Sequence, residues 1–292
     1  MLTIHSTPEL RSPTLLCALA GWPDAGAAAS GAIEFLIMKW APRRFAELDS
    51  QAIYVQSNNR PSGRLVQPGQ RKLRWPRLAF YALPVPHAPR DLVLLLGAEP
   101  DLRWRTCANA ILDLAGRLGV DTVVTLGAFL APVPHGGPVV LSGRAARPDL
   151  GRKLAALGLR EGRYEGPTGF PTVLLDAATR RGLGAASVWA ASPIYLRALP
   201  NPKLAAGLLR VVERLLQVDV GLTELEVAGR DLERRIDDEL RARPDLERFV
   251  ERLAGAHEDD EEAEATPGEL PTAQELLDDL EQYLRGLRES DA

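Results

Sequence analysis

The sequence contains little of the chemistry from which metal, redox or disulfide sites are built. Its 292 residues include two cysteines, two methionines and four histidines, and aromatic residues make up 5%. Two cysteines are too few for a disulfide framework, so we expect the reducing environment of the cytoplasm. The histidines (His5, His87, His135 and His257) have no metal-ligand spacing, so no metal site is expected. There is no glycine-rich phosphate loop and no nucleophile elbow, and the sequence therefore predicts no cofactor.

Long apolar runs are also absent. No stretch approaches the roughly 20 residues that cross a bilayer. Residues 1–5 do not lead from a basic segment into an apolar one, which argues against secretion. Basic residues do not form runs interleaved with aromatics. We therefore expect a protein that binds neither membranes nor nucleic acids.

The small net charge of −4 conceals a division along the chain. Residues 1–219 contain 26 basic and 16 acidic residues, whereas residues 220–292 contain 9 basic and 23 acidic residues. One interpretation is that each part is simply soluble. The other is that acidic helices of the second part lie on, or compete for, a basic face of the first.

Three apolar runs end abruptly in small, rigid or polar residues. They are residues 15–20 before Gly21, 92–96 before Gly97, and 123–126 before Gly127. Strands that are apolar throughout are typical of a parallel sheet covered on both faces. Helical patterns follow each run, so the predicted class is α/β. Ligands of such sheets bind beyond the carboxyl ends of the strands.

The remaining pattern predicts further strands and helices. Strands are expected at residues 44–48, 53–56, 72–75, 78–83, 121–127, 139–142 and 185–190, with a loop at 57–71. Helices are expected at residues 24–39, 101–118, 149–157, 170–181 and 201–216.

The chain divides into four predicted parts. Residues 1–219 form the α/β core and residues 220–254 a helical part. Residues 255–271 are an acidic linker with almost nothing to bury. Residues 272–292 are a terminal amphipathic helix, which opens with a capping box and presents Leu276, Leu280, Tyr283 and Leu287 at helical spacing.

Residues 21–26 (Gly-Trp-Pro-Asp-Ala-Gly) are the most specific local feature. A helix that starts just beyond a buried strand directs its free N–H groups and positive end outward, which favours an anion or a polar ligand. Asp24 is placed either to contact such a ligand or to cap the helix.

Two other segments offer similar alternatives. Glu99 and Arg103 form an ion pair or receive the polar groups of a substrate. Residues 164–169 form a rigid turn or a ligand loop with Thr168 at a helix start. The candidate ligand-binding residues are Gly21, Asp24, Gly26, Glu99, Arg103, Gly127, His135, Gly166, Thr168 and Gly169.

These motifs, in this order, resemble the proteasome assembly chaperone type 2 superfamily in its actinobacterial-like branch. The resemblance covers residues 14–255. It rests on residues 21–26, 90–97, 99–104, 125–128, 133–135, 164–169 and 200–203.

The resemblance implies a three-layer α/β/α sandwich like that of nucleoside phosphorylases and related hydrolases, followed by a C-terminal helical extension. It also implies a homo-oligomer. The chain departs from the family at its last residues, which lack a hydrophobic–Tyr–any-residue ending. It departs again at residues 192–195, where Ser-Pro-Ile-Tyr contains no histidine.

Two functions follow as hypotheses. The first is a non-enzymatic assembly or scaffold protein that contacts other chains. The second is a protein that binds or hydrolyses a nucleoside-like or anionic small molecule at the carboxyl edge of the sheet. No catalytic residue is assigned.

Overall fold

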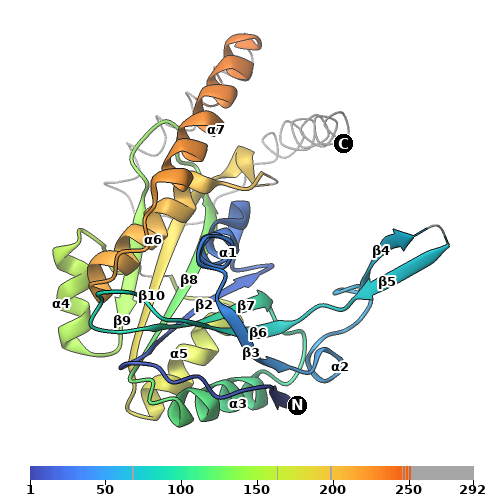
Figure 1. Ribbon diagram of the computed structural model, residues 1–292. Coiled ribbons are helices and arrows are strands. Elements are labelled where there is room, and N and C mark those ends of the chain that lie inside the picture. Colours follow the sequence, from blue (N-terminus) through green and yellow to red (C-terminus); the bar gives the residue numbers. More distant parts are fainter. Residues whose placement is uncertain are drawn as a thin grey trace.

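An eight-stranded mixed sheet organises the chain in the computed structural model, which describes residues 1–67, 69–162, 164–197, 199–244, 246, 248 and 250 (Figure 1). In spatial order the strands are β1 (Leu2–Ile4), β3 (Arg43–Leu48), β6 (Leu78–Leu83), β7 (Leu92–Ala98), β2 (Thr14–Ala20), β8 (Thr122–Ala131), β10 (Gly184–Pro193) and β9 (Leu141–Ala145). A separate hairpin pairs β4 (Ser62–Gln67) with β5 (Gln70–Arg74).

Along the chain, the helices occur in the segments that connect these strands or follow them. They are η1 (Ala25–Ala27), α1 (Ala28–Trp40), α2 (Ser50–Ile53), α3 (Trp104–Arg117), α4 (Pro148–Ala156), α5 (Phe170–Arg180), η2 (Ile194–Leu196), α6 (Pro202–Leu216) and α7 (Thr223–Arg241). The α/β class predicted from the sequence is confirmed.

Four central strands, β7, β2, β8 and β10, run parallel, and three of them contain the predicted apolar runs. The other four strands pair antiparallel. The sheet is therefore mixed, and the expectation of a parallel sheet holds only for its centre. Parallel neighbours need a long crossover, whereas β6 and β7 are joined by a short loop that permits only antiparallel pairing.

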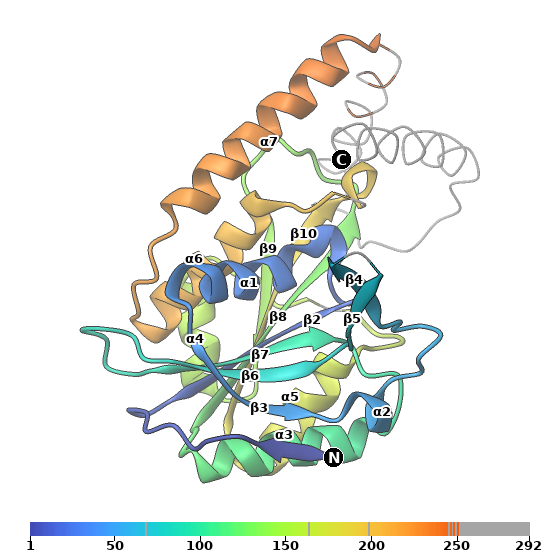
Figure 2. The same cartoon turned by 45° about the vertical axis from the view of Figure 1, so that its right-hand side comes forward.

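Alternating side chains of the central strands enter two separate apolar cores. In β2, Leu16 and Ala18 face one core, and Leu15, Cys17 and Leu19 face the other. Helices α1 and α6 contribute to the first core, and α3 and α5 contribute to the second. Figure 2 shows these helix pairs on opposite sides of the sheet. The arrangement explains why strands of the centre are apolar at every position.

Three local predictions were wrong. Residues 53–56 are not a strand, because α2 ends at Ile53. Residues 57–71 are not a loop, because β4 and the start of β5 lie within them. The first helix does not begin at Asp24, since Gly26 and Ala27 have left-handed backbone with φ of 62° and 45°.

Helix α7 packs along α6 and contributes Leu225 to the first core. None of the helices formed by the described residues is both long enough and apolar enough to span a bilayer. The predicted acidic linker at 255–271 and the predicted terminal helix at 272–292 lie outside the described residues. The four-part division of the chain stays a prediction.

Both cysteines lie in the core shared by α3 and α5 and have no solvent exposure. Burial raises the pKa of the Cys17 thiol to about 12 and that of the Cys107 thiol to about 11. Both groups are therefore neutral thiols at physiological pH.

Gly97 provides a test of the sheet packing. A Cβ there would lie 2.1 Å from the Arg77 carbonyl oxygen, a backbone atom that cannot rotate away. Gly97→Ala should lower the free energy of unfolding by about 3 kcal/mol, measured by urea denaturation. Gly31→Ala in α1 is the matched control, because nothing lies within 4 Å of its Cβ. It should raise the stability by about 0.5–1 kcal/mol. Equal effects of the two substitutions would contradict this packing.

Candidate functional site

The loops that follow β2, β7 and β8 lie side by side at one edge of the sheet. The Glu99 N–H donates to the Ala20 carbonyl at 2.8 Å, and the Ala128 N–H donates to the Pro23 carbonyl at 2.9 Å. The chain after β2 therefore runs between the ends of its two neighbours. This places most of the candidate residues at a common edge.

Asp24 lies beneath the N-terminus of α1 and is 8% exposed. Its Oδ1 accepts from the Ala29 and Ser30 N–H groups at 2.7 and 3.1 Å, and its Oδ2 accepts from the Ser30 hydroxyl at 2.5 Å. Burial raises the pKa of the carboxyl group, and the hydrogen bonds from Ser30 and Ala29 partly offset this. Asp24 thus satisfies N–H groups of the first helical turn, which otherwise have no acceptor.

Glu99 performs the same task for a different helix. The N-cap of α5 is Gly169, which has no side chain to offer, and Glu99 Oε1 accepts instead from the Phe170 N–H at 2.6 Å. Burial, with a contribution from Asp101, raises the pKa of Glu99 against the lowering effect of the Phe170 bond. A carboxylate directly after β7 therefore caps a helix about 70 residues further along the chain.

The glycines around Glu99 permit this contact. A Cβ on Gly169 would lie 2.8 Å from Glu99 Oε1 and 3.4 Å from the ring of Trp22. A Cβ on Gly21 would lie 3.7 Å from the Glu99 Cβ, and Gly21 has a φ of 122°. The structure thus brings together Gly21, Glu99 and Gly169 from three separate segments, with Trp22 beside them.

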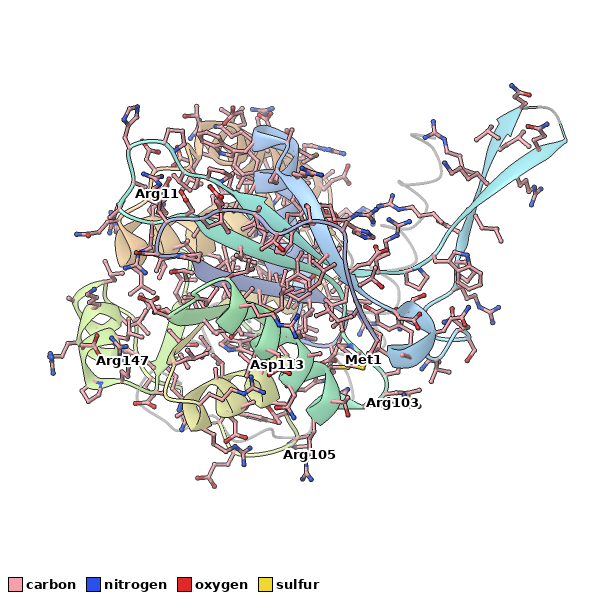
Figure 3. All side chains as sticks on the ribbon, turned by 60° about the horizontal axis from the view of Figure 1, so that its bottom comes forward. Met1, Arg11, Arg103, Arg105, Asp113 and Arg147 are labelled. Carbon is pink, nitrogen blue, oxygen red and sulfur yellow. The ribbon has the colours of Figure 1, made fainter. Side chains whose placement is uncertain are left out.

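Arg103 is not part of this group. Among the ion pairs of the described residues, none joins it to Glu99, whose carboxylate is directed to α5. Arg103 is the N-cap of α3, with left-handed backbone at φ 56°. Figure 3 shows it at the outer end of that helix, near Arg105. The Glu99–Arg103 ion pair considered from the sequence is therefore not formed.

Gly26 contacts α6 and not the Glu99 group. Its carbonyl accepts from the Asn201 N–H at 2.8 Å, and the Asn201 side chain accepts from the Leu204 N–H at 3.2 Å as the cap of α6. A Cβ on Gly26 would approach the Ser192 hydroxyl to 3.1 Å. That buried hydroxyl has no hydrogen-bond partner among the described atoms. The N-terminal ends of α1 and α6 are thus held together through Gly26.

Gly127 is explained by its neighbour in the sheet. It lies opposite Trp189 of β10, and a Cβ on Gly127 would approach the indole ring to 2.5 Å. The missing side chain makes room for the tryptophan. Packing therefore accounts for this residue without a ligand.

Residues 164–169 form a turn that closes on itself. The Tyr164 hydroxyl donates to the Pro167 carbonyl at 3.1 Å, and Gly166 has a φ of 158° beneath the tyrosine ring. Thr168 is exposed. Of the two interpretations from the sequence, this geometry favours the rigid turn.

His135 lies in a hydrogen-bonded cluster whose members were not predicted together from the sequence. Its Nδ1 lies 2.8 Å from the Tyr195 hydroxyl, and its Nε2 lies 2.9 Å from Asp237 Oδ1 on α7. Lys203 donates to the His135 carbonyl at 2.7 Å and also pairs with Glu233 of α7. The cluster fastens the loop after β8 to α6 and α7. The cavity beside it has a volume of about 10 Å³, about the least that can hold a single water.

The sequence contained one signal for this cluster. Glu233 and Asp237 are four residues apart and so share a face of a helix. It did not show which loop they would meet, because His135 lies about 100 residues earlier in the chain.

A larger groove of about 490 Å³ adjoins this cluster between α6, α7 and β9, and Lys203 lines both the groove and the small cavity. None of the candidate residues lines the groove. No group of three or more His, Cys, Asp or Glu side chains within the described ranges is placed to hold a metal ion.

Large apolar side chains are exposed along the same edge of the sheet. Trp22 is 63% exposed, Phe129 44%, Leu130 39% and Tyr164 71%. Trp22 follows β2, Phe129 and Leu130 end β8, and Tyr164 precedes α5. The carboxylates of this edge are thus occupied by backbone N–H groups, while its aromatic side chains face solvent.

Comparison with known proteins assigns the chain to a family. The sequence model of the PAC2 family matches residues 18–240. A search of curated protein sequences finds no match.

Two solved structures are similar in sequence as well as in fold. A PAC2 family protein from Streptomyces avermitilis is 42% identical, with a TM-score of 0.71 over 77% of this chain and 95% of that chain. A proteasome-assembly chaperone homologue from Mycobacterium tuberculosis is 40% identical, with a TM-score of 0.71 over 77% of this chain and 94% of that chain. An archaeal proteasome activator from Pyrococcus furiosus shares the fold alone, at 19% identity and a TM-score of 0.65 over 82% of this chain and 97% of that chain.

The capping role of Asp24 is testable. Asp24→Ala leaves two backbone N–H groups and a hydroxyl buried without an acceptor, so it should lower the free energy of unfolding by about 2 kcal/mol. Asp24→Asn keeps an acceptor oxygen and should cost less than about 1 kcal/mol. Urea denaturation measures both values. Unchanged stability in both variants would show that Asp24 is not a structural cap.

The raised pKa of Glu99 makes its contribution depend on pH. The folded state holds the proton more tightly than the unfolded chain does. This stabilisation is therefore fully present below the unfolded pKa of about 4.3 and is lost as the pH rises through the folded pKa. Glu99→Gln keeps an acceptor for Phe170 but does not titrate. The stability of the native protein minus that of the variant should fall as the pH rises above about 4, measured by urea denaturation. A difference independent of pH would contradict the assignment.

Proposed function

The chain belongs to the PAC2 family, and we propose that it is a non-enzymatic assembly protein that binds other protein chains, with proteasome subunits as its partners. The name of its relative from Mycobacterium tuberculosis, a proteasome-assembly chaperone homologue, suggests the partner class.

One observation carries this proposal. The edge of the sheet where α/β proteins bind small molecules has its carboxylates engaged as helix caps and its aromatic side chains exposed. Asp24 accepts three hydrogen bonds and Glu99 accepts one, all from the protein itself. Trp22, Phe129 and Tyr164 are more than 40% exposed. Exposed aromatic side chains at a polar rim are typical of surfaces that bind proteins.

The alternative, a small-molecule binder or hydrolase, would have to displace these contacts. A ligand at Asp24 or Glu99 would leave N–H groups of α1 or α5 without an acceptor, at a cost of about 1–3 kcal/mol for each. The observed geometry therefore favours protein binding.

We also propose that the chain forms a homo-oligomer in the cytoplasm, with the sandwich arrangement of the nucleoside phosphorylase-like proteins. Four parallel strands flanked by antiparallel ones, with helices on both faces, support the arrangement. The exposed apolar edge supports self-association. Light scattering after size-exclusion chromatography should give a multiple of the 31.8 kDa chain mass.

The exposed aromatic residues provide the direct test. The double substitution Trp22→Ser with Phe129→Ser should weaken binding to purified, unassembled proteasome subunits at least about tenfold, because such aromatics dominate interface energies. Its stability should change by less than about 1 kcal/mol, since the side chains are exposed. Biolayer interferometry measures binding, and urea denaturation measures stability.

Met38→Ser is the matched control, because Met38 is 75% exposed on α1 and is remote from the strand ends. It should bind as the unmodified protein does. Absence of binding by the unmodified protein, or equal binding by all three proteins, would overturn the proposal.

A further inference from the structure

The hairpin formed by β4 and β5 projects from the body of the protein (Figure 1). Every residue of both strands is exposed. Two paired strands without a supporting surface are at best marginally stable in water. The hairpin therefore has the form of an arm that lacks a packing partner within the described part of the chain.

The two faces of the arm differ in chemistry. The register pairs Gly63 with Leu73 and Arg64 with Lys72. Because side chains alternate along a strand and Leu65 is paired with Arg71, the residues Leu65, Arg71 and Leu73 share one face, and Arg64, Lys72 and Arg74 share the other. Leu65 and Leu73 are more than half exposed. A partner must therefore offer both apolar and charged groups.

A partner of the arm must carry negative charge. Residues 57–77 contain six basic residues and no acidic residue. Arg64 and Lys72 lie directly opposite each other, an arrangement of like charges that destabilises a strand pair. Arg74, at the base, lies close enough to Glu34 of α1 to lower the pKa of that carboxyl, which burial and Asp24 raise. The ion pairs within the described ranges include neither Arg64 nor Lys72.

The chain itself contains a segment of matching composition. Residues 251–292 include 14 acidic and 3 basic residues. Within them, Leu276, Leu280, Tyr283 and Leu287 follow helical spacing among acidic neighbours. The segment is therefore both acidic and periodically apolar, as the arm requires.

The tether favours this occupant over a free partner. Residues 251–275 separate Val250 from the apolar stripe and, at about 3.3 Å per extended residue, allow it to reach any part of the molecule. Covalent linkage to the same chain raises the local concentration of the segment at the arm to on the order of 1 mM. A free acidic protein would have to compete with it.

We propose that the β4–β5 arm is the docking site for the acidic C-terminal segment of the same molecule, residues 276–287. The acidic residues of the segment contact basic side chains of the arm, and its leucines and tyrosine cover Leu65 and Leu73. This inference does not depend on the proposed function.

The test uses the full-length chain with two added labelling sites, Gln70→Cys at the turn of the arm and Gln282→Cys in the segment. The native Cys17 and Cys107 are buried, so a donor and an acceptor dye react with the added thiols alone. Energy transfer should be efficient at low salt. It should fall by at least about half as salt rises from about 0.05 M to about 1 M, because salt screens the exposed charges.

Charge reversal on the arm, Arg64→Glu with Lys72→Glu, should lower the transfer by a similar amount. Adding Asp278→Lys with Asp279→Lys to that variant should restore it. Arg105→Glu with Arg152→Glu is the matched control, because it makes the same change of charge at exposed positions on α3 and α4. The control should leave the transfer unchanged.

Several outcomes would overturn the proposal. One is inefficient transfer in the unmodified sequence at low salt. Another is transfer that is insensitive to Arg64→Glu with Lys72→Glu. A third is transfer found only between molecules labelled singly and then mixed, which would place the segment of a second copy on the arm.

Discussion

Backbone N–H groups at buried helix ends need hydrogen-bond acceptors, and this need determines how the polar residues at the carboxyl edge of the sheet are arranged. Parallel strands deliver successive helices to one edge, and each helix begins with N–H groups that have no acceptor within the helix. Asp24 meets this need for α1, Glu99 for α5 and Asn201 for α6. The polar residues of the edge are thereby used internally. What remains for a partner is the set of exposed aromatic side chains, and this is why the geometry favours protein binding.

The sequence predicted those parts of the fold whose stability comes mainly from the burial of apolar side chains. The apolar runs that became β2, β7 and β8 were visible because burial on both faces excludes polar residues. Strand β4 was missed because none of its residues is buried and Gly63 and the proline at 61 are typical of loops. A strand whose side chains are all exposed has no apolar pattern from which it could be predicted.

The sequence predicted that the candidate residues lie at one edge of the sheet, and it did not predict their contacts. The shared edge followed from strand direction, but the partner of each carboxylate did not. Glu99 was considered with Arg103, four residues away, whereas its actual contact is Phe170, far along the chain. His135 was named without Tyr195 or Asp237 for the same reason. Contacts between distant segments depend on the register of the whole sheet, which local patterns do not contain.

The division of charge along the chain has a structural counterpart in α7. Acidic side chains of this helix contact Lys39, Lys203 and Arg210 of the core. The buried positions of the helix are few, namely Leu225, Gly229 and Ile236. Ionic contacts therefore accompany the apolar packing of Leu225 and Ile236 in placing α7 on α6.

The two neutral thiols buried between the sheet and α3 can report whether a molecule has opened, because they become reactive only when the core is exposed. An alkylating reagent reacts with the thiolate form and needs contact with the sulfur, so the native protein is protected on both grounds. A molecule that separates α3 from the sheet even briefly acquires irreversible mass increments at Cys17 and Cys107. Mass spectrometry of the intact chain after exposure to the reagent thus reports the fraction of molecules that have opened, with no residue changed.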